Sequence, residues 1–369
     1  MSNRLFARSP VLVAALAAAA LACQEDPQSP TPGNDEAASG GPAAAVTVAA
    51  TYTVKDLGTL GGTSAMANGI NDQGGVVGWS TLANGRPHAF LWRAGTMRDL
   101  GALAGGRSEA NDINSNDVVV GWSTVANGAQ RAVRWQSGKI TNLGSLGGRN
   151  SQATAINDFG VIVGWSETTA GTTHAFVWQN GVMRDLGTLG GSYSVALDIN
   201  NAGKIVGGAG VASQQNHAVT WKNGVIKDLG TNGHDGSIAS AVNTKGQIAG
   251  TLGPFADAEG EELDFSYPFI YDQGTWISIG GRGPTNELNA LNKNGIAVGS
   301  GSDLRDDSGQ EHAWVSQPGV LDGLPPLTPG GLDRNEANDI NSFGTIVGMS
   351  TEIIGNSTGP NHAVLWRRQ

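Results

Sequence analysis

The feature that most constrains the fold of this chain is a short repeated motif, an Ile, Val or Leu followed by Asn. The motif recurs at intervals of 43, 43, 43, 43, 49 and 49 residues. Its anchor asparagines are Asn71, Asn114, Asn157, Asn200, Asn243, Asn292 and Asn341. A period in the forties indicates a repeat architecture, in which one supersecondary unit is stacked several times. The stretch Asp185–Trp221 illustrates the unit, and we number the seven repeats in chain order.

Each repeat contains four short segments that are typical of β-strands. In the first repeat they are Ser64–Asn71, Gly75–Ser80, His88–Trp92 and Thr96–Leu100. Tight turns separate the first from the second and the third from the fourth, and no helical periodicity is present. Four strands in about 43 residues predict a propeller blade, because the coil of a β-solenoid has roughly half this period.

The two ends of the repeat region complement each other. Thr51–Gly58 matches the fourth strand of a repeat, whereas His362–Trp366 matches a third strand with no fourth strand after it. Pairing the two segments protects edges that an open array would expose. We therefore expect an all-β protein, a seven-bladed β-propeller with four antiparallel strands per blade, closed by the N-terminal strand (about 51–58) completing the last blade. The propeller domain is expected to span 51–369.

The N-terminal 50 residues have a different character. Arg4 and Arg8 precede a short apolar run that ends at Cys23, the only cysteine. This pattern predicts a signal peptide over 1–22, and the residues before Cys23 resemble a lipobox, which implies lipid on its sulfur. The alternative is a plain secretory peptide cut nearby. Residues 23–50 are rich in Pro, Gly, Ser and acids and are interpreted as a disordered tether. We therefore expect an exported protein, lipid-anchored to the cell envelope at the outer membrane or cell surface.

The repeats resemble those of the HAF-repeat family of bacterial extracellular proteins. The motifs that carry the resemblance are DLGTLGG at 56–62 and 185–191, and HAF followed by Trp at 88–92 and 174–178. The resemblance covers about 51–369 and weakens in the last three repeats. It implies surface location and a repeat fold, and it implies no catalytic activity.

Histidine recurs on the expected third strands, at His88, His174, His217, His312 and His362. Metal ligands must lie within a few ångströms of one ion, whereas equivalent positions of different repeats lie far apart. We interpret these histidines and the anchor asparagines as structural. Aspartate recurs near the fourth strands, at Asp56, Asp99, Asp185, Asp228 and Asp322, and a strand-end or turn role is favoured over calcium binding.

Two sets of residues depart from the repeat. Trp79, Trp122 and Trp165 end the second strands of the first three repeats only. Three indoles near one rim would form a candidate platform for a sugar or a partner's side chain, and the alternative is packing between blades.

Two long loops of the fifth and sixth repeats are acidic, so they are candidates for Ca²⁺ or for a basic partner, and the alternative is a solvated surface. Their calcium candidates are Asp257, Glu259, Glu261, Asp264, Asp303, Asp306 and Asp307.

The net charge and the absence of enzyme motifs limit the functions that are expected. The formal net charge is −10, so nucleic acid is not expected as a partner. Hydrolase and phosphate-binding motifs are absent from the sequence, and we expect no catalytic residues and no enzyme activity. The sequence predicts a monomeric binding module that recognises an unknown surface protein or glycan through the face with the loops between second and third strands. The membrane would be reached only through the lipid on Cys23. The alternatives are a passive structural surface protein and a glycan hydrolase.

Overall fold

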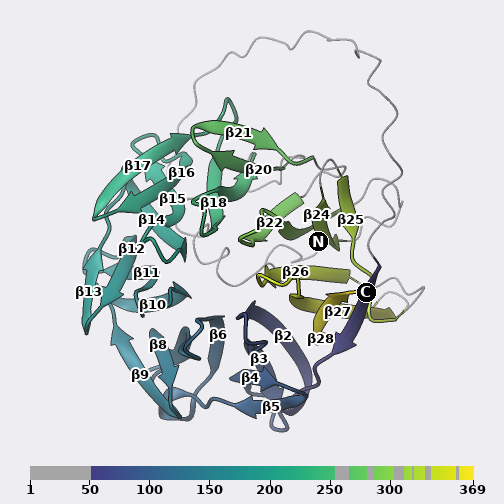
Figure 1. Ribbon diagram of the computed structural model, residues 1–369. Coiled ribbons are helices and arrows are strands. Elements are labelled where there is room, and N and C mark those ends of the chain that lie inside the picture. The colour runs from purple at the N-terminus through teal and green to yellow at the C-terminus, as the bar shows by residue number, and fades with distance from the viewer. Residues whose placement is uncertain are drawn as a thin grey trace, which may run out of the picture.

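The computed structural model describes residues 51–253, 266–280, 286–302, 311–317, 320–328, 334–354 and 357–369. Within them the chain is an all-β propeller, and Figure 1 shows its sheets arranged around a common centre. The first strands of the repeats are innermost. They are β2 (Gly61–Ile70), β6 (Ser108–Ile113), β10 (Gly147–Ile156), β14 (Gly190–Ile199), β18 (Ser237–Val242), β22 (Asn286–Leu291) and β26 (Arg334–Ile340).

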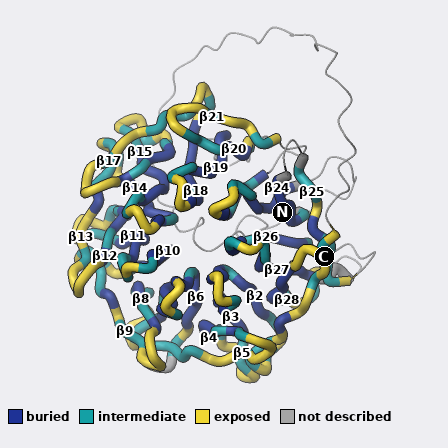
Figure 2. Tube along the Cα trace, viewed as in Figure 1, coloured by how far each residue is buried: buried dark blue, intermediate teal, exposed yellow. Residues whose placement is uncertain are grey.

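The second and third strands of each repeat form the middle of each sheet. The second strands are β3 (Val76–Leu82), β7 (Val119–Thr124), β11 (Ile162–Thr168), β15 (Ile205–Val211), β19 (Ile248–Leu252), β23 (Ala297–Ser302) and β27 (Ile346–Ile354). The third strands are β4 (Pro87–Arg93), β8 (Gln130–Gln136), β12 (Thr173–Gln179), β16 (Asn216–Lys222), β20 (Tyr267–Asp272), β24 (Glu311–Gln317) and β28 (Ser357–Arg368). The middle strands are mostly buried and the outer rim is mostly exposed, as Figure 2 shows.

The outer strands complete the sheets. They are β5 (Thr96–Asp99), β9 (Lys139–Gly144), β13 (Val182–Asp185), β17 (Val225–Gly230), β21 (Thr275–Ser278) and β25 (Val320–Gly323). The outermost strand of the last sheet is β1 (Tyr52–Asp56), which pairs antiparallel with β28 and places Val54 opposite Trp366. One 3₁₀ turn, η1 (Leu103–Gly105), lies between β5 and β6.

The expectation of seven separate four-stranded blades is wrong. The described strands form five four-stranded blades and one eight-stranded sheet that runs from β10 to β17. The cause is local: Thr173 of β12 forms a parallel bridge with Tyr193 of β14, so backbone pairing continues from the third repeat into the fourth. Between the other neighbouring repeats, the strand pairing of the described residues ends at the outer strands.

The anchor asparagines form a closed ring of hydrogen bonds. Each side-chain Nδ2 donates to the backbone carbonyl oxygen of the next anchor at 3.0–3.3 Å, and Asn341 donates to Asn71 across the two ends of the chain. Each Oδ1 accepts the backbone N–H four residues later, as Gly75 N–H does for Asn71 at 2.8 Å. All seven are 4–7% exposed, so unpaired amides there would be costly. This network explains why asparagine marks the period.

Serines join the third strand of one repeat to the first strand of the next. Ser108 Oγ accepts the N–H of Ala89 at 2.9 Å and donates to the carbonyl oxygen of Gly101 at 2.8 Å. Ser151, Ser194 and Ser237 make the equivalent two bonds. Apolar packing fills the space between the sheets, and where the ends meet one cluster combines Leu57, Phe90, Val347 and Leu365. Burial of these side chains is the main stabilising contribution.

Candidate binding face

Strand direction gives the ring two different faces. Antiparallel strands place the turns between first and second strands, and between third and fourth strands, at one end; we call this the anchor face. The loops between second and third strands, such as 82–86 and 125–129, and the connections between repeats lie at the opposite end, which we call the loop face. Leu82 N–H donates to the Arg86 carbonyl oxygen and Gly85 N–H to that of Leu82, both at 2.9 Å. In the first four repeats the loops of this face are therefore short, hydrogen-bonded hairpins.

The repeated histidines and aspartates pair with each other at the rim of the ring. His174 Nδ1 lies 2.8 Å from Asp185 Oδ2, and Asp185 Oδ1 accepts the N–H of Gly187 at 2.7 Å. The equivalent pairs are His88 with Asp99, His217 with Asp228, and His362 with Asp56. Each carboxylate thus fixes both the histidine and the turn that leads to the next repeat. His312 occupies the equivalent position on β24.

The two repeats that lack the histidine also lack the aspartate. The second repeat has Arg131 and Asn142 at these positions, and the fifth has Tyr267 and Ser278. The joint replacement is the pattern expected of two positions that act as a unit. Sequence reasoning treated the histidines and aspartates as separate series, although their shared absences were readable in the sequence.

The three candidate tryptophans lie at equivalent points of their second strands, opposite residues of the inner strands. Trp79 pairs with Met66, Trp122 with Glu109 and Trp165 with Gln152. Trp165 is 5% exposed and packs with Tyr193, Val195, Leu197 and Ile238. Its burial favours packing over ligand stacking. Trp79 and Trp122 are half-buried, so an aromatic platform stays a prediction for those two side chains.

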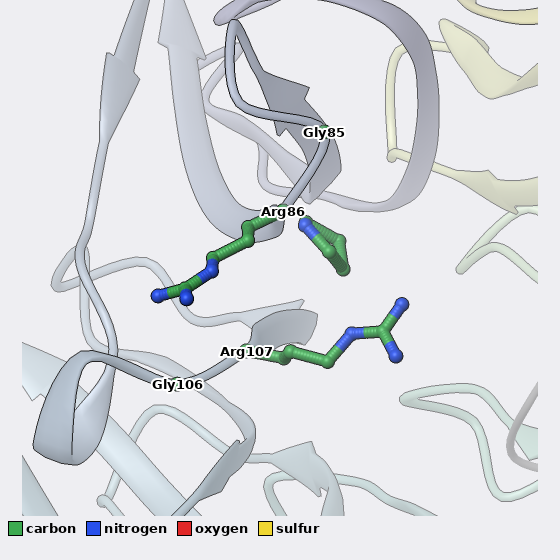
Figure 3. A pocket seen from close by; sticks show the side chains of 5 residues that line it. Gly85, Arg86, Gly106 and Arg107 are labelled. Atoms are coloured by element: carbon green, nitrogen blue, oxygen red, sulfur yellow. The ribbon is translucent and has the colours of Figure 1, made fainter.

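A hollow of about 380 Å³ opens on the loop face where the first repeat meets the second. Gly85, Arg86 and Pro87 line it from the first repeat, and Gly106 and Arg107 line it from the segment before β6. Figure 3 shows the two arginine side chains running in opposite directions along the hollow, with their guanidinium groups toward its two ends. Both arginines are exposed. The hollow therefore combines a glycine and proline floor with two permanent positive charges.

The next junction shows why this hollow is open. At the position equivalent to Gly106, the third repeat has Arg149, whose Nη2 donates to the Asn127 carbonyl oxygen at 3.3 Å and lies over Gly128. Gly106 has no side chain to cover the equivalent loop, because a Cβ there would collide with Thr124. Sequence reasoning missed this site. The available signal was a departure from the repeat, with arginine at 86 and glycine at 106.

A second set of polar residues lies inside the ring. Asp112, Asp198 and Asp339 precede the anchor motif in the second, fourth and seventh repeats. One Oδ of each accepts the next N–H in its own strand, and the other accepts an N–H of the following repeat at 2.7–2.8 Å, as Asp339 does from Ile70. Burial raises their pKa values to about 7, about 6 and about 7, respectively. Mutual repulsion contributes to the raised pKa of Asp112.

Glu109 is a further buried carboxyl group, on β6. It is 5% exposed, and desolvation raises its pKa to about 7. Asn68 Nδ2 donates to its Oε1 at 2.9 Å and opposes that rise in pKa. The Trp122 indole N–H lies close enough to lower the pKa as well, although it makes no hydrogen bond of acceptable geometry. The hydrogen bond from Asn68 to Glu109 joins the inner strands β2 and β6.

Several predicted features lie outside the described residues. These are the signal peptide, Cys23, the tether, and all seven calcium candidates of the acidic loops, Asp257, Glu259, Glu261, Asp264, Asp303, Asp306 and Asp307. Within the described ranges, no group of three His, Cys, Asp or Glu side chains is arranged to hold a metal ion. No helix in that part of the chain is long and apolar enough to cross a membrane.

Comparison with known proteins adds limited information. No family model matches the chain, and no curated protein matches it. Among solved structures it is similar to TolB from Acinetobacter baumannii, with 13% identity and a TM-score of 0.43, over 57% of this chain and 52% of that one. The matched region thus spans about half of TolB.

Two further similar structures extend over more of the ring. A gluconolactonase from Xanthomonas campestris has 13% identity and a TM-score of 0.41, over 86% of this chain and 89% of its own. A sialidase from Trypanosoma rangeli has 9% identity and a TM-score of 0.39, over 87% and 60%. At these values we transfer no site and no activity to this chain.

Proposed function

We propose that this chain is a surface binding module, and that the hollow between Arg86 and Arg107 on the loop face receives an acidic group of a glycan or a protein. The observation that carries the proposal is the hollow itself, lined by two exposed arginines, whereas at the next junction Arg149 donates to the Asn127 carbonyl oxygen. Guanidinium groups bind carboxylate and sulfate oxygens through paired N–H donors. A volume of about 380 Å³ suits one sugar ring or one side chain.

Different residues hold the scaffold and line the hollow, which supports a binding role. The repeated histidines, aspartates, serines and asparagines are engaged in bonds that hold the scaffold. Among the first four repeats only the first has arginine at the position of Arg86, whereas Arg107 recurs as Arg334 in the seventh repeat. The first junction therefore departs from the repeat at Arg86 and Gly106, and a function must be argued from such a site and not from the shared scaffold. We assign the chain no catalytic step.

We further propose that the module is exported and held at the cell envelope by lipid on Cys23, as a member of the HAF-repeat group. The supporting observations are the charged and apolar pattern before Cys23 and the repeated DLG and HAF motifs. Mass spectrometry of the cell-envelope fraction tests this directly. A diacylglycerol-modified Cys23 at the mature N-terminus is expected, and an unmodified cysteine would reject the anchor while leaving the hollow untouched.

The binding proposal is tested by titration with two probes, an oligomer of galacturonic acid and an aspartate-rich peptide. At least one is expected to bind, and Arg107→Ala should weaken that binding by roughly tenfold, or ~1.4 kcal/mol. Added salt should weaken the wild-type interaction, because the charges are exposed.

The matched control is Arg149→Ala, which removes an arginine from the same face at the next junction, where its guanidinium is bonded to Asn127. This variant should bind as the wild type does. Equal losses in the two variants would show that the overall charge of the face, and not the hollow, attracts the probe. Failure of both probes to bind would reject an acidic ligand.

A further inference from the structure

The anchor face displays the most exposed apolar side chains of the described residues. Phe159 and Phe343 are each 75% exposed at the tips of turns between first and second strands. Val225 and Val182, at 68% and 50%, begin fourth strands immediately after turns at the same face. Apolar groups exposed to this extent mark a surface that meets a partner.

Cationic side chains occupy the same face as these apolar side chains. Lys293 Nζ lies 5.7 Å from the centre of the Phe343 ring, and Lys245 occupies the turn position equivalent to Phe159. Other cations of the anchor-face turns and strand ends are Arg93, Lys139, Lys204, Lys222, Arg367 and Arg368. This surface is basic although the whole chain carries a formal charge of −10.

The acids of this face are mostly engaged by neighbouring groups. Asp117 is paired with Arg93 at 2.6 Å, and Asp158 accepts from Ser115 and Asn201. Asp72 accepts the N–H of Ser342, and Asp272 accepts from Gln247. The described cations of the anchor face therefore outnumber its acids, which matches a partner with a negatively charged surface.

The route of the chain places its N-terminal segment at the same face. β1 begins at Tyr52 opposite Arg368, the end of a third strand, and the Gln369 N–H donates to the Thr51 carbonyl oxygen at 2.9 Å. Third strands end at the anchor face. The described part of the chain therefore begins, at Thr51, on the anchor face.

We propose that the anchor face docks on an anionic lipid bilayer, with Phe159 and Phe343 inserted at the level of the headgroups. Aromatic and aliphatic side chains flanked by lysine and arginine are the composition that binds such an interface. The two phenylalanines belong to the third and seventh repeats, so they contact the membrane at separate points of the ring. Docking in this way turns the loop face and its hollow away from the membrane.

The test uses the full chain with Cys23→Ser, which leaves no other cysteine. A fluorophore is placed at Ala202→Cys, a turn tip of the anchor face, or at Asn84→Cys, a loop of the loop face; both positions are exposed. The chain is bound to vesicles of equal parts phosphatidylglycerol and phosphatidylcholine that contain spin-labelled lipid. Quenching at 202 is expected to exceed quenching at 84 by about fivefold or more, because a headgroup-level label lies within quenching range.

Substitution of both phenylalanines identifies the contact. Phe159→Ser with Phe343→Ser should abolish the difference in quenching between the two labels. The matched control, Tyr267→Ser with Ile277→Ser, removes side chains that are 43% and 46% exposed away from the anchor-face turns, and should preserve it. Thermal unfolding of both double variants checks that the ring is intact. Equal quenching at 84 and 202 in the parent chain, or a difference that survives loss of both phenylalanines, would overturn the proposal.

Discussion

At the residue scale, asparagine shows most clearly how the ring is held together. One side chain of Asn71 donates to Asn114 and accepts from Gly75 while only 5% exposed. A carboxamide is the side chain that offers a donor and an acceptor without charge, and both are needed here. Aspartate would lack the donor, and serine would be too short to span the gap to the next repeat.

Removal of one anchor should therefore be costly. We expect Asn71→Ala to reduce the free energy of unfolding by about 2–4 kcal/mol, because it strands a buried N–H and a buried carbonyl group. Urea denaturation measures this change. The control is Gln73→Ala in the same turn, an exposed residue for which a change within about 0.5 kcal/mol is expected. Equal effects of the two substitutions would contradict the structural role of the ring.

Glycine illustrates what the sequence could not show at this scale. Sequence reasoning assigned the periodic glycines to turns, and Gly74 indeed has a φ of 74°. Gly78, however, lies within the second strand, where a Cβ would collide with the carbonyl oxygen of Met66 on the neighbouring inner strand. A close approach between backbones leaves no periodic signal that differs from that of a turn.

At the element scale, the strand order was predictable from repeat spacing and turn residues, whereas the joining of sheets was not. The bridge between Thr173 and Tyr193 depends on a small difference in how two neighbouring sheets meet. Such a difference is a tertiary effect, and no local propensity encodes it. The hollow beside Gly106 was missed as well, although glycine at 106 departs from the repeat, because the sequence alone does not show which side chains cover a junction.

The rim pair of histidine and aspartate should be transferable between repeats. In the second repeat, Arg131→His together with Asn142→Asp is expected to restore it. The free energy of unfolding of the double variant should exceed the value expected from adding the effects of the two single changes by about 0.5–1 kcal/mol. A double-mutant cycle of unfolding free energies measures this difference.

An additive cycle at the second repeat would contradict the assignment of the two positions as a unit. A reference cycle on His174→Gln and Asp185→Asn calibrates the coupling where the pair already exists at 2.8 Å. We expect the two cycles to agree in sign.

At the scale of the whole molecule, the buried carboxyl groups make the ring sensitive to pH. Asp112, Asp198 and Asp339 have native pKa values of about 7, 6 and 7, above the ~3.9 of an unfolded chain. Between about pH 4 and about pH 7 the native state therefore binds more protons than the unfolded state. The free energy of unfolding should fall as the pH rises through this window, by up to ~1.4 kcal/mol per group and pKa unit.

Aspartates with lowered pKa values do not cancel this fall in the free energy of unfolding. The pKa values of Asp117 and Asp158 are lowered from 3.8, so their contribution is lost only at more acidic pH. Urea midpoints measured from pH 5 to pH 8 test the sign. The triple variant Asp112→Asn, Asp198→Asn, Asp339→Asn should show a flatter dependence, and a wild-type midpoint that rises with pH across this range would contradict the desolvation of these groups.

The central claim is that a scaffold held by repeated polar residues presents the hollow between its first two repeats to an acidic ligand. Amide hydrogen exchange, recorded with and without the acidic probe that binds, tests it most directly. Added probe should slow exchange at Gly85, Arg86, Gly106 and Arg107 and leave the equivalent amides around Gly128 and Arg149 unchanged. Protection confined to the anchor face, or spread equally over equivalent loops of several repeats, would contradict the claim.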